Sequence, residues 1–517
     1  MPRYNTPAAK PAVQSPVTTT GQSGTTYEGA PGYERDVKSA LFLLAVAHLG
    51  DGSFYEKKAE RDERFRGLIR TVAAEEDGPE WLGKFVLWLR GTANMRTASV
   101  VVAAETAKAF LDAGRPGGRQ LIASALQRSD EPGELIAYWA SRHGRNIPMP
   151  VKRGTADAAK RLYSEYALLK YDTASHGYRF ADVIELCHPK AREPWRDQLF
   201  RTALDRRHGH EDQFPEALPM MIANRALRSA AAEDPQVLLD TDALARAGMT
   251  WEDVLSLAGD RVPKKDLWTA LIPVMGYMAL LRNLRNFDDA GIPDELAAEV
   301  AARLSDPDQV ARSRQFPFRF LSAYKAAPSL RWAYPLEKAL NLSLVNVPRL
   351  KGSTLILVDR SGSMFGKVSE KSGLSQADTA ALFGTALAIA SEKADLVQFG
   401  TDSETVPFRG SSSVLAVIGS FTEMGGTYTA AAVQAHYRGH DRVVILTDEQ
   451  AWYPGDPADL VPAGIPVYTW NLAGYARGHA PSGTGNRHTF GGLTDNSFRL
   501  IQLLEAGRSA DWDDLFG

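Results

Sequence analysis

The sequence predicts two structural parts, a helical-repeat part followed by an α/β domain with a doubly wound parallel sheet. From about Tyr33 to Leu344, apolar residues recur with helical spacing and are separated by Gly, Pro and Asp, while alternating strand patterns are hardly visible. After Val347 and Pro348, short β-rich runs alternate with helical stretches, which is typical of a parallel sheet. The length of 517 residues favours more than one hydrophobic core.

The first part is predicted to be helical throughout. Its segments with helical spacing include Val37 to His48, Trp81 to Arg90, Ala98 to Ala113 and Asp157 to Tyr171. Many short helices without strands predict stacked helix pairs, a HEAT-like solenoid, although no fixed-period repeat is visible. Residues 1–28 are rich in Pro, Thr, Ser and Gly and lack an apolar run, so we expect a flexible tail there rather than a secretory signal. The helical-repeat domain is therefore predicted over residues 29–347.

The second part, residues 348–517, is predicted to contain the doubly wound, Rossmann-like sheet. Its β-rich runs are residues 353–359, 394–400, 442–448 and 465–472. Helical stretches between these runs include Ser375 to Lys393 and Tyr428 to Tyr437. In such sheets the ligand crevice lies beyond the carboxyl ends of the strands, so we expect any site at that edge.

Composition and charge exclude several classes of protein. Apolar residues make up 44% of the chain, which indicates a folded protein and not a disordered one. The longest apolar runs are far shorter than the ~20 residues that cross a bilayer, so no membrane partner is expected. The single cysteine, Cys187, cannot form an intramolecular disulfide, which suits a reducing cytoplasm. Residues 351–517 are acidic and residues 1–350 weakly basic, so an anionic partner would need local clusters of cations.

A set of oxygen donors follows the ends of the predicted strands. Asp359, Ser361 and Ser363 form a D-x-S-x-S array directly after the first strand. Thr427 follows two glycines and precedes a helix, and Asp448 ends the third strand. Carboxylates and hydroxyls suit Mg²⁺ or another hard divalent cation, so these five residues predict a metal site. The structural alternative is an ordinary strand-to-helix turn with a capping serine.

The order of these donors resembles the metal-ion-dependent adhesion site of von Willebrand factor A-type domains. This resemblance implies that the open position of the metal accepts an acidic group of a partner, and that catalysis is not the usual outcome. Ser361 lacks the G-x-S-x-G context of an esterase, and no nearby histidine is placed as a base, so we expect no enzymatic activity. A metal-dependent hydrolase is the least favoured alternative.

Basic residues and tyrosines alternate between residues 142 and 171. The basic residues are Arg142, Arg145, Lys152, Arg153, Lys160, Arg161 and Lys170, and the tyrosines are Tyr163, Tyr166 and Tyr171. Cations can neutralise phosphates and tyrosines can stack on unpaired bases, so single-stranded RNA is a candidate ligand. The alternative is a solvated helix face, which composition alone favours.

Four segments of the chain resemble the TROVE module of Ro ribonucleoproteins, in a bacterial-type arrangement. They are residues 42–58, the stretch around Asn94-Met95-Arg96-Thr97, residues 168–190 and residues 271–287. The resemblance spans most of residues 30–345, and Ro proteins have a TROVE module followed by an A-type domain. It implies a ring of helical repeats, closed by the A-type domain, that binds small structured Y-like RNAs on its outer surface. It also implies that unpaired 3′ ends of misfolded RNAs enter the central hole, for RNA quality control in the cytoplasm.

The resemblance further implies which residues contact RNA. Lys170 and His188 match the RNA-binding segment of the family. A basic residue that the family has shortly after the lysine is missing here, and Arg179 is its candidate replacement. Additional candidates are Asn94, Arg96, Arg282, Asn283 and Arg285.

Each RNA-binding candidate also has a structural alternative. Lys170 can be a solvated helix end, and His188 a satisfied, partly buried histidine. Asn94 and Arg96 can be a helix cap and a structural ion pair. The three candidates between residues 282 and 285 can simply close a helix.

The predicted partners are small Y-like RNA and misfolded RNA, with no DNA and with the protein as a monomer. A nuclease or another protein partner is compatible with this hypothesis, and the sequence does not identify it. The competing hypothesis is a protein-interaction scaffold that uses the Mg²⁺ site of the A-type domain, without RNA.

Overall fold

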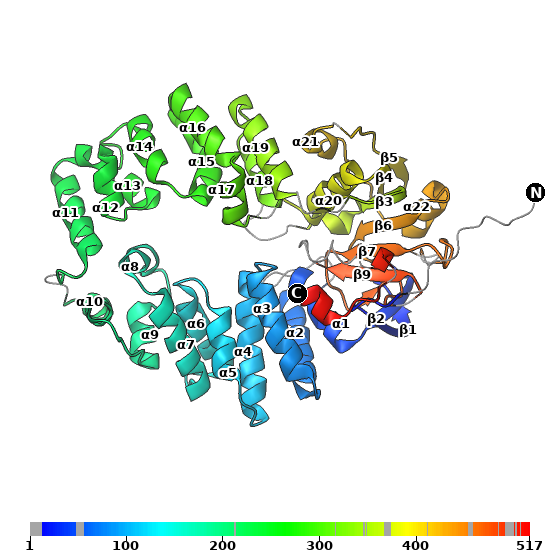
Figure 1. Ribbon diagram of the computed structural model, residues 1–517, viewed down its shortest axis with the longest axis horizontal. Coiled ribbons are helices and arrows are strands. Elements are labelled where there is room, and N and C mark those ends of the chain that lie inside the picture. Colours follow the sequence, from blue (N-terminus) through cyan, green and yellow to red (C-terminus); the bar gives the residue numbers. More distant parts are fainter. Residues whose placement is uncertain are drawn as a thin grey trace, which may run out of the picture. The chain divides into compact units, whose positions relative to one another are not determined.

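The computed structural model describes most of the 517 residues (Figure 1). The described residues are 13–47, 56–210, 214–315, 317–344, 347, 349–366, 374–410, 412–452, 457, 459–483, 485–491, 501, 504–506 and 508–517. They form two compact units. The first contains the described residues within 1–98, 316–322 and 343–517, and the second those within 99–315 and 323–342. Part of the segment at residues 42–58 and the first 12 residues of the predicted tail lie outside the described residues.

A six-stranded sheet organises the first unit. Its strands are β3 (Ser353–Asp359), β4 (Lys393–Phe399), β5 (Ser403–Thr405), β6 (Arg442–Thr447), β7 (Val467–Asn471) and β9 (Arg487–Gly491). Their order is β5-β4-β3-β6-β7-β9, with all neighbours parallel except β5, which runs antiparallel to β4. Because the chain continues from β3 to β4 on one side and places β6 on the other, the order reverses between β3 and β6. This is the switch point at which doubly wound sheets bind ligands.

Helices cover the sheet because its central strands are apolar on both faces. They are α20 (Gln376–Ala390), α21 (Val414–Ile418) and α22 (Thr429–His436), with a short 3₁₀ helix, η3 (Gly362–Phe365), after β3. Helix α20 packs against β3 and β4. A Cβ atom on Gly384 would lie 2.5 Å from Val358 Cγ2, so glycine is what permits the close approach of α20 to β3.

The four β-rich runs predicted from the sequence each contain an observed strand, β3, β4, β6 or β7. The short strands β5 and β9 were not predicted. β5 has only three residues, and all five residues of β9 are buried despite the polar side chains of Arg487 and His488. The predicted fold class, helical repeats with a doubly wound α/β domain, is confirmed.

A three-stranded antiparallel sheet joins both ends of the chain within the first unit. It consists of β1 (Thr19–Thr25), β2 (Pro31–Arg35) and β8 (Arg477–Gly478), in the order β1-β2-β8. The prediction of a flexible tail was therefore wrong for residues 13–28. The Thr19 amide donates to the Ser482 carbonyl at 3.2 Å, and Val17 is buried. These partners are more than 460 residues away in the sequence, so local composition contains no sign of them.

Three N-terminal helices and one C-terminal helix complete the first unit. They are α1 (Val37–Ala47), α2 (Lys58–Ala74), α3 (Gly78–Gly91) and α24 (Trp512–Phe516). Aromatic side chains join them: the ring centroid of Trp512 lies 5.3 Å from that of Phe42 and 5.2 Å from that of Trp81. Phe516 stacks on Phe85 at 5.7 Å. The described residues among the first 98 thus belong to the same unit as the six-stranded sheet, whereas the sequence placed residues 29–98 in the helical-repeat domain.

The second unit is an array of helices (Figure 1). Its helices are α4 (Arg96–Asp112), α5 (Gly118–Ala125), α6 (Glu131–His143), α7 (Met149–Leu162), α8 (Glu165–Tyr171), α9 (Phe180–Cys187), α10 (Pro194–His208), α11 (Pro219–Glu233), η1 (Pro235–Leu239), α12 (Thr241–Arg246), α13 (Trp251–Ala258), α14 (Lys264–Leu271), η2 (Ile272–Val274), α15 (Tyr277–Ala290), α16 (Asp294–Leu304), α17 (Pro307–Ser313), α18 (Pro317–Ala326) and α19 (Leu330–Ser343). The first three residues of α4, residues 317–322 of α18 and the last residue of α19 belong to the first unit. Packing pairs include α5 with α7, α7 with α9, and α15 with α16.

Local capping explains where one predicted helix divides. The sequence predicted one helical segment from Asp157 to Tyr171, but α7 ends at Leu162 and α8 begins at Glu165. The Ser164 side chain accepts a hydrogen bond from the Ala167 amide at 3.2 Å, which starts a new helix.

No described helix is long and apolar enough to cross a membrane. Closure of the helices into a ring stays a prediction.

The aromatic cluster around α24 should contribute substantially to stability. We expect Trp512→Ala to lower the free energy of unfolding by about 2–3 kcal/mol, because Trp512 is half-buried between α1 and α3. Leu87→Ala on α3 is the control, since Leu87 is 55% exposed and should change stability by less than about 0.5 kcal/mol. Urea unfolding of the full chain measures both, and equal effects would contradict the packing role of Trp512.

Candidate functional site

The five predicted metal ligands lie at or just after the carboxyl ends of β3 and β6, or just before α22. Asp359 is the last residue of β3, and Asp448 directly follows β6. All five side chains belong to buried residues, and both aspartates have no exposed surface. The hydroxyl oxygens of Ser361 and Ser363 are 3.2 Å apart. The positions match what a doubly wound sheet predicts, because adjacent parallel strands end at one edge.

Backbone hydrogen bonds join the three loops that contain these residues. The Gly362 amide donates to the Gly425 carbonyl at 2.7 Å, which links the D-x-S-x-S loop to the glycine-threonine loop. The Trp452 amide donates to the Thr427 carbonyl at 2.8 Å, which links that loop to the segment after β6. The structure therefore brings together segments that are up to 89 residues apart, counted from Asp359 to Asp448. These backbone hydrogen bonds between the loops fix the positions of the side chains whose oxygens are the predicted metal ligands.

The two carboxylates disfavour each other's ionisation. Burial raises the pKa of Asp359 above its usual range, although the Ser361 and Thr447 hydrogen bonds oppose this. Burial, and next the neighbouring charge of Asp359, together raise the pKa of Asp448 to about 7. A cation that binds both carboxylates stabilises the buried pair, because its positive charge compensates the two negative charges that water would solvate at a surface.

The donor set fits a hard divalent cation. Asp448 Oδ1 accepts a hydrogen bond from the Gln450 amide at 3.0 Å, whereas its Oδ2 is buried and has no hydrogen-bond partner within the described chain. An unpartnered buried carboxylate oxygen is costly unless a ligand satisfies it. No cluster of three or more His, Cys, Asp or Glu side chains in the described residues forms another metal site. Two carboxylates and three hydroxyls leave part of an octahedral shell for water or a partner's oxygen.

A cluster of cations and tyrosines lies in the second unit around α8. Lys170 Nζ is 5.3 Å from the ring centroids of both Tyr166 and Tyr171, and it donates to the Tyr166 hydroxyl at 3.3 Å. The guanidinium carbon of Arg128 is 5.4 Å from the Tyr171 centroid. Tyr166 is 42% exposed, so its ring is accessible to a ligand. Cations beside an exposed ring can contact a phosphate and a base together.

Comparison with known proteins agrees with this architecture. The TROVE domain model matches residues 243–344. Telomerase protein component 1 of Mus musculus is 25% identical over 382 residues, which cover 64% of this chain and 14% of that protein. The same protein of Rattus norvegicus is 26% identical over 300 residues, which cover 49% of this chain and 11% of that protein. This chain therefore spans a small part of the length of these relatives.

A solved structure has a similar fold. The crystal structure of the Ro (RSR) protein of Deinococcus radiodurans matches with a TM-score of 0.58 and 19% sequence identity, over 84% of this chain and 93% of that chain. The sequence match to the TROVE domain thus covers residues 243–344, and the likeness to the solved Ro protein shows a shared fold.

Two of the candidates that Ro resemblance indicates have accessible positions. Lys170 is the penultimate residue of α8, within the cation and tyrosine cluster. His188 is exposed and terminates α9 in the left-handed region with φ +48°. Its amide donates to the Ile184 carbonyl at 2.9 Å, so the backbone is fixed while the ring is accessible to solvent. The alternative of a partly buried histidine is therefore wrong for His188.

Arg179 has a structural role. Its Nη2 lies 2.5 Å from Asp172 Oδ2, its Nε lies 3.2 Å from Asp172 Oδ1, and the same Oδ1 accepts from the Phe180 amide at 3.0 Å. Asp172 is buried, so this bidentate pair neutralises a charge that would otherwise be uncompensated. We therefore correct the assignment of Arg179 from RNA contact to structural ion pair.

The remaining candidates divide according to exposure. Asn283 is buried, donates to the Ala279 carbonyl at 2.8 Å and accepts from Asn286 at 2.7 Å, so its assignment as an RNA contact was wrong. Arg282 is exposed on α15 and has no ion-pair partner among the described residues. Arg285 Nε lies 3.8 Å from Asp289 Oδ2, and both side chains are exposed at the surface. The structure brings neither arginine to the α8 cluster.

The last two candidates belong to the turn between α3 and α4. Asn94 adopts φ +50° in this turn, and Arg96 is the first residue of α4. Asparagine tolerates the left-handed conformation better than most residues, so a turn role explains Asn94 without RNA.

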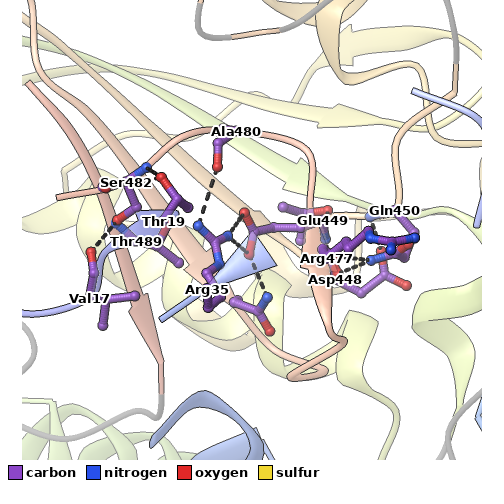
Figure 2. Close-up of polar contacts among 12 residues, drawn as sticks. Val17, Thr19, Arg35, Asp448, Glu449, Gln450, Arg477, Ala480, Ser482 and Thr489 are labelled. Atoms are coloured by element: carbon purple, nitrogen blue, oxygen red, sulfur yellow. Dashed lines mark hydrogen bonds and ion pairs between the residues drawn. The ribbon is translucent and has the colours of Figure 1, made fainter. Parts of the chain in front are cut away.

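Sequence reasoning missed two residues that shape the metal site. The Thr447 hydroxyl donates to Asp359 Oδ2 at 2.6 Å, and its position directly before Asp448 was the available signal. Glu449 adopts φ +61° and forms a buried ion pair with Arg35, with Arg35 Nη2 2.6 Å from Glu449 Oε1 (Figure 2). No sequence signal connects residues 414 positions apart.

The raised pKa of Asp448 gives a testable pH dependence. Its pKa is about 7 in the folded chain and about 4 when unfolded, so between these values the folded state binds the extra proton. Stability without metal should therefore fall as pH rises from about 4 to about 7. We expect Asp448→Asn to be more stable than the wild type at pH 8 in EDTA, with the difference shrinking toward pH 4 in urea unfolding.

Asp402→Asn provides the control for this measurement, because Asp402 is exposed after β4. Because the Asp402 side chain is exposed, the substitution should change the free energy of unfolding at pH 8 by less than about 0.5 kcal/mol. A pH-independent difference for Asp448→Asn would contradict a buried, mutually repelling carboxylate pair.

Proposed function

We propose that this protein is a non-catalytic RNA-binding protein of the Ro type, acting as a cytoplasmic monomer in RNA quality control. It binds small structured Y-like RNAs on an outer surface of the helical repeats and unpaired 3′ ends of misfolded RNAs in a central hole. The observation on which this proposal rests is the TROVE match at residues 243–344. The cation and tyrosine cluster around Lys170 adds a physical site for the ligand.

The chemistry of this cluster suits an unpaired nucleotide. Lys170 supplies a charge for a phosphate oxygen, and the exposed ring of Tyr166 supplies a stacking face. Neither group reads the edge of a base, so the cluster favours shape and backbone recognition over sequence readout. That preference agrees with binding of RNAs that share an unpaired end but differ in sequence.

We also propose that the A-type domain binds Mg²⁺ or another divalent cation through Asp359, Ser361, Ser363, Thr427 and Asp448. When bound, the ion supplies an open coordination position for a carboxylate of a protein partner, such as a nuclease. The five residues hold the ion, and their buried loops exclude bulk water from one side of it. Asp448 Oδ2 is the described oxygen that most clearly lacks a partner without the ion.

RNA binding is tested by Lys170→Ala in the full chain. We expect weaker binding of RNA with a single-stranded 3′ tail and a salt dependence reduced by about one counterion, because one phosphate contact is lost. Lys160→Ala is the matched control, since Lys160 Nζ is paired with Asp157 Oδ1 at 2.8 Å in the same basic stretch. Filter binding over a salt series measures both.

Two outcomes would contradict the RNA proposal. One is that tailed RNA binds no better than a blunt duplex, and the other is that Lys170→Ala and Lys160→Ala behave alike. Sequencing the RNA that copurifies with the protein from its own cells identifies the native ligand.

A protein-interaction scaffold without RNA is the second candidate, and the buried donor set of the A-type domain favours it. If a protein partner binds through the metal, Asp359→Ala should abolish its copurification, because one of the two carboxylates is removed. Lys170→Ala should retain the partner. Pull-down of both variants from the native cells measures this, and a partner that persists with Asp359→Ala contradicts metal-mediated capture.

A further inference from the structure

The loop after β6 is held in place by the N-terminal segment of the chain, residues 26–35. The Thr26 hydroxyl donates to the Ala451 carbonyl at 2.8 Å, and the Ala30 amide donates to the same carbonyl at 3.2 Å. The Tyr27 amide donates to Gln450 Oε1 at 2.9 Å. The segment therefore contacts the loop at two successive residues, Gln450 and Ala451, which follow Asp448 and Glu449.

A buried ion pair adds a third point of attachment (Figure 2). Arg35 Nη2 is 2.6 Å from Glu449 Oε1 and 2.8 Å from Oε2, and the side chains are 1% and 0% exposed. Arg35 Nη1 also donates to the Ala480 carbonyl at 3.3 Å, and Asn471 Nδ2 donates to Glu449 Oε2 at 2.5 Å. A Cβ atom on Gly478 would lie 2.3 Å from Arg35 Nη2, so a larger residue there would displace the side chains of the pair.

The residues that the N-terminal segment holds are the ones that orient the two metal-site carboxylates. The Glu449 amide donates to Thr447 Oγ1 at 3.0 Å, and the Thr447 hydroxyl in turn donates to Asp359 Oδ2 at 2.6 Å. The Gln450 amide donates to Asp448 Oδ1 at 3.0 Å. Each aspartate is thus aimed by a backbone amide of the loop, directly for Asp448 and through one hydroxyl for Asp359.

Glu449 needs an external constraint to keep this geometry. Its φ of +61° lies in the left-handed region, which is unfavourable for a residue with a Cβ atom and persists where surrounding contacts impose it. The ion pair with Arg35 and the hydrogen bond from Asn471 are such contacts. Without these contacts we expect the backbone at Glu449 to relax, which would change the directions of the Glu449 and Gln450 amides.

We propose that the N-terminal segment is a positioning element of the metal site, with Arg35 as its principal residue. Arg35 does not touch the cation. It fixes Glu449, and Glu449 and Gln450 in turn fix the directions of the Asp359 and Asp448 oxygens. The inference rests on the metal site of the proposed function, and it adds that cation affinity depends on residues outside the A-type domain's own loops.

The test is the Mg²⁺ affinity of the full chain, measured by isothermal titration calorimetry with Mg²⁺ alone. The variant Arg35→Met with Glu449→Met removes both charges together and so avoids an unpaired buried ion. We expect at least a tenfold weaker affinity, with unchanged circular dichroism. Arg35→Lys, which keeps the charge, should recover part of the lost affinity.

Arg477→Met is the matched control on the same small sheet. Arg477 Nη2 pairs with Glu34 Oε1 at 3.0 Å at the surface, and only its backbone carbonyl contacts Gln450. Its Mg²⁺ affinity should equal that of the wild type. A control as weak as the double variant would overturn the assignment to Arg35.

The remaining outcomes separate the inference from the metal site itself. A folded double variant with wild-type affinity overturns the positioning role but leaves the site intact. If the double variant does not fold, Gln450→Ala decides, because it removes the side-chain contact to Tyr27 and keeps both charges; unchanged affinity there overturns the inference. A wild type that does not bind Mg²⁺ overturns the proposed metal site, and the positioning role with it.

Discussion

The buried ion pair between Arg35 and Glu449 is the interaction that connects the N-terminal segment to the six-stranded sheet of the first unit. It joins β2, near the start of the chain, to the loop after β6, and its side chains have almost no contact with water. Loss of either partner would leave an uncompensated buried charge, at a cost of roughly 3–5 kcal/mol. The pair therefore connects residues 13–35 to the α/β domain within one structural unit. The aromatic contacts of Trp512 with Phe42 and Trp81 connect the C-terminal helix to the same region.

Two kinds of site with opposite electrostatic requirements occur in this chain, and each lies in a different unit. The oxygen donors around Asp359 and Asp448 need a cation, whereas the cluster around Lys170 suits an anion. Phosphates would bind poorly at the acidic donors unless a metal ion intervened. This separation is compatible with an RNA on the helical repeats and a protein partner on the A-type domain, and it requires no catalytic group in either place.

Several residues chosen from family resemblance have ordinary structural functions. Arg179 neutralises the buried Asp172, and Asn283 satisfies its amide within α15. Asn283 lies within α15 and Arg179 is the N-cap residue of α9, and the sequence pattern alone does not distinguish a polar side chain with local partners from an exposed one. Lys170 and His188 lie at the carboxyl ends of α8 and α9, and both are exposed.

The sequence by itself determined the fold class, and it predicted five oxygen donors whose role in binding a metal stays a prediction. Short apolar runs such as residues 353–359, alternating with helical stretches, predict buried parallel strands, and the residues that follow adjacent parallel strands lie at one sheet edge. Only the tertiary structure decided that residues 13–35 belong with the A-type domain, and that Glu449 is held by Arg35. The physical reason is that strand pairing and ion pairing between distant segments depend on which surfaces meet after folding. The local periodicity of the sequence contains no information about such contacts between distant segments.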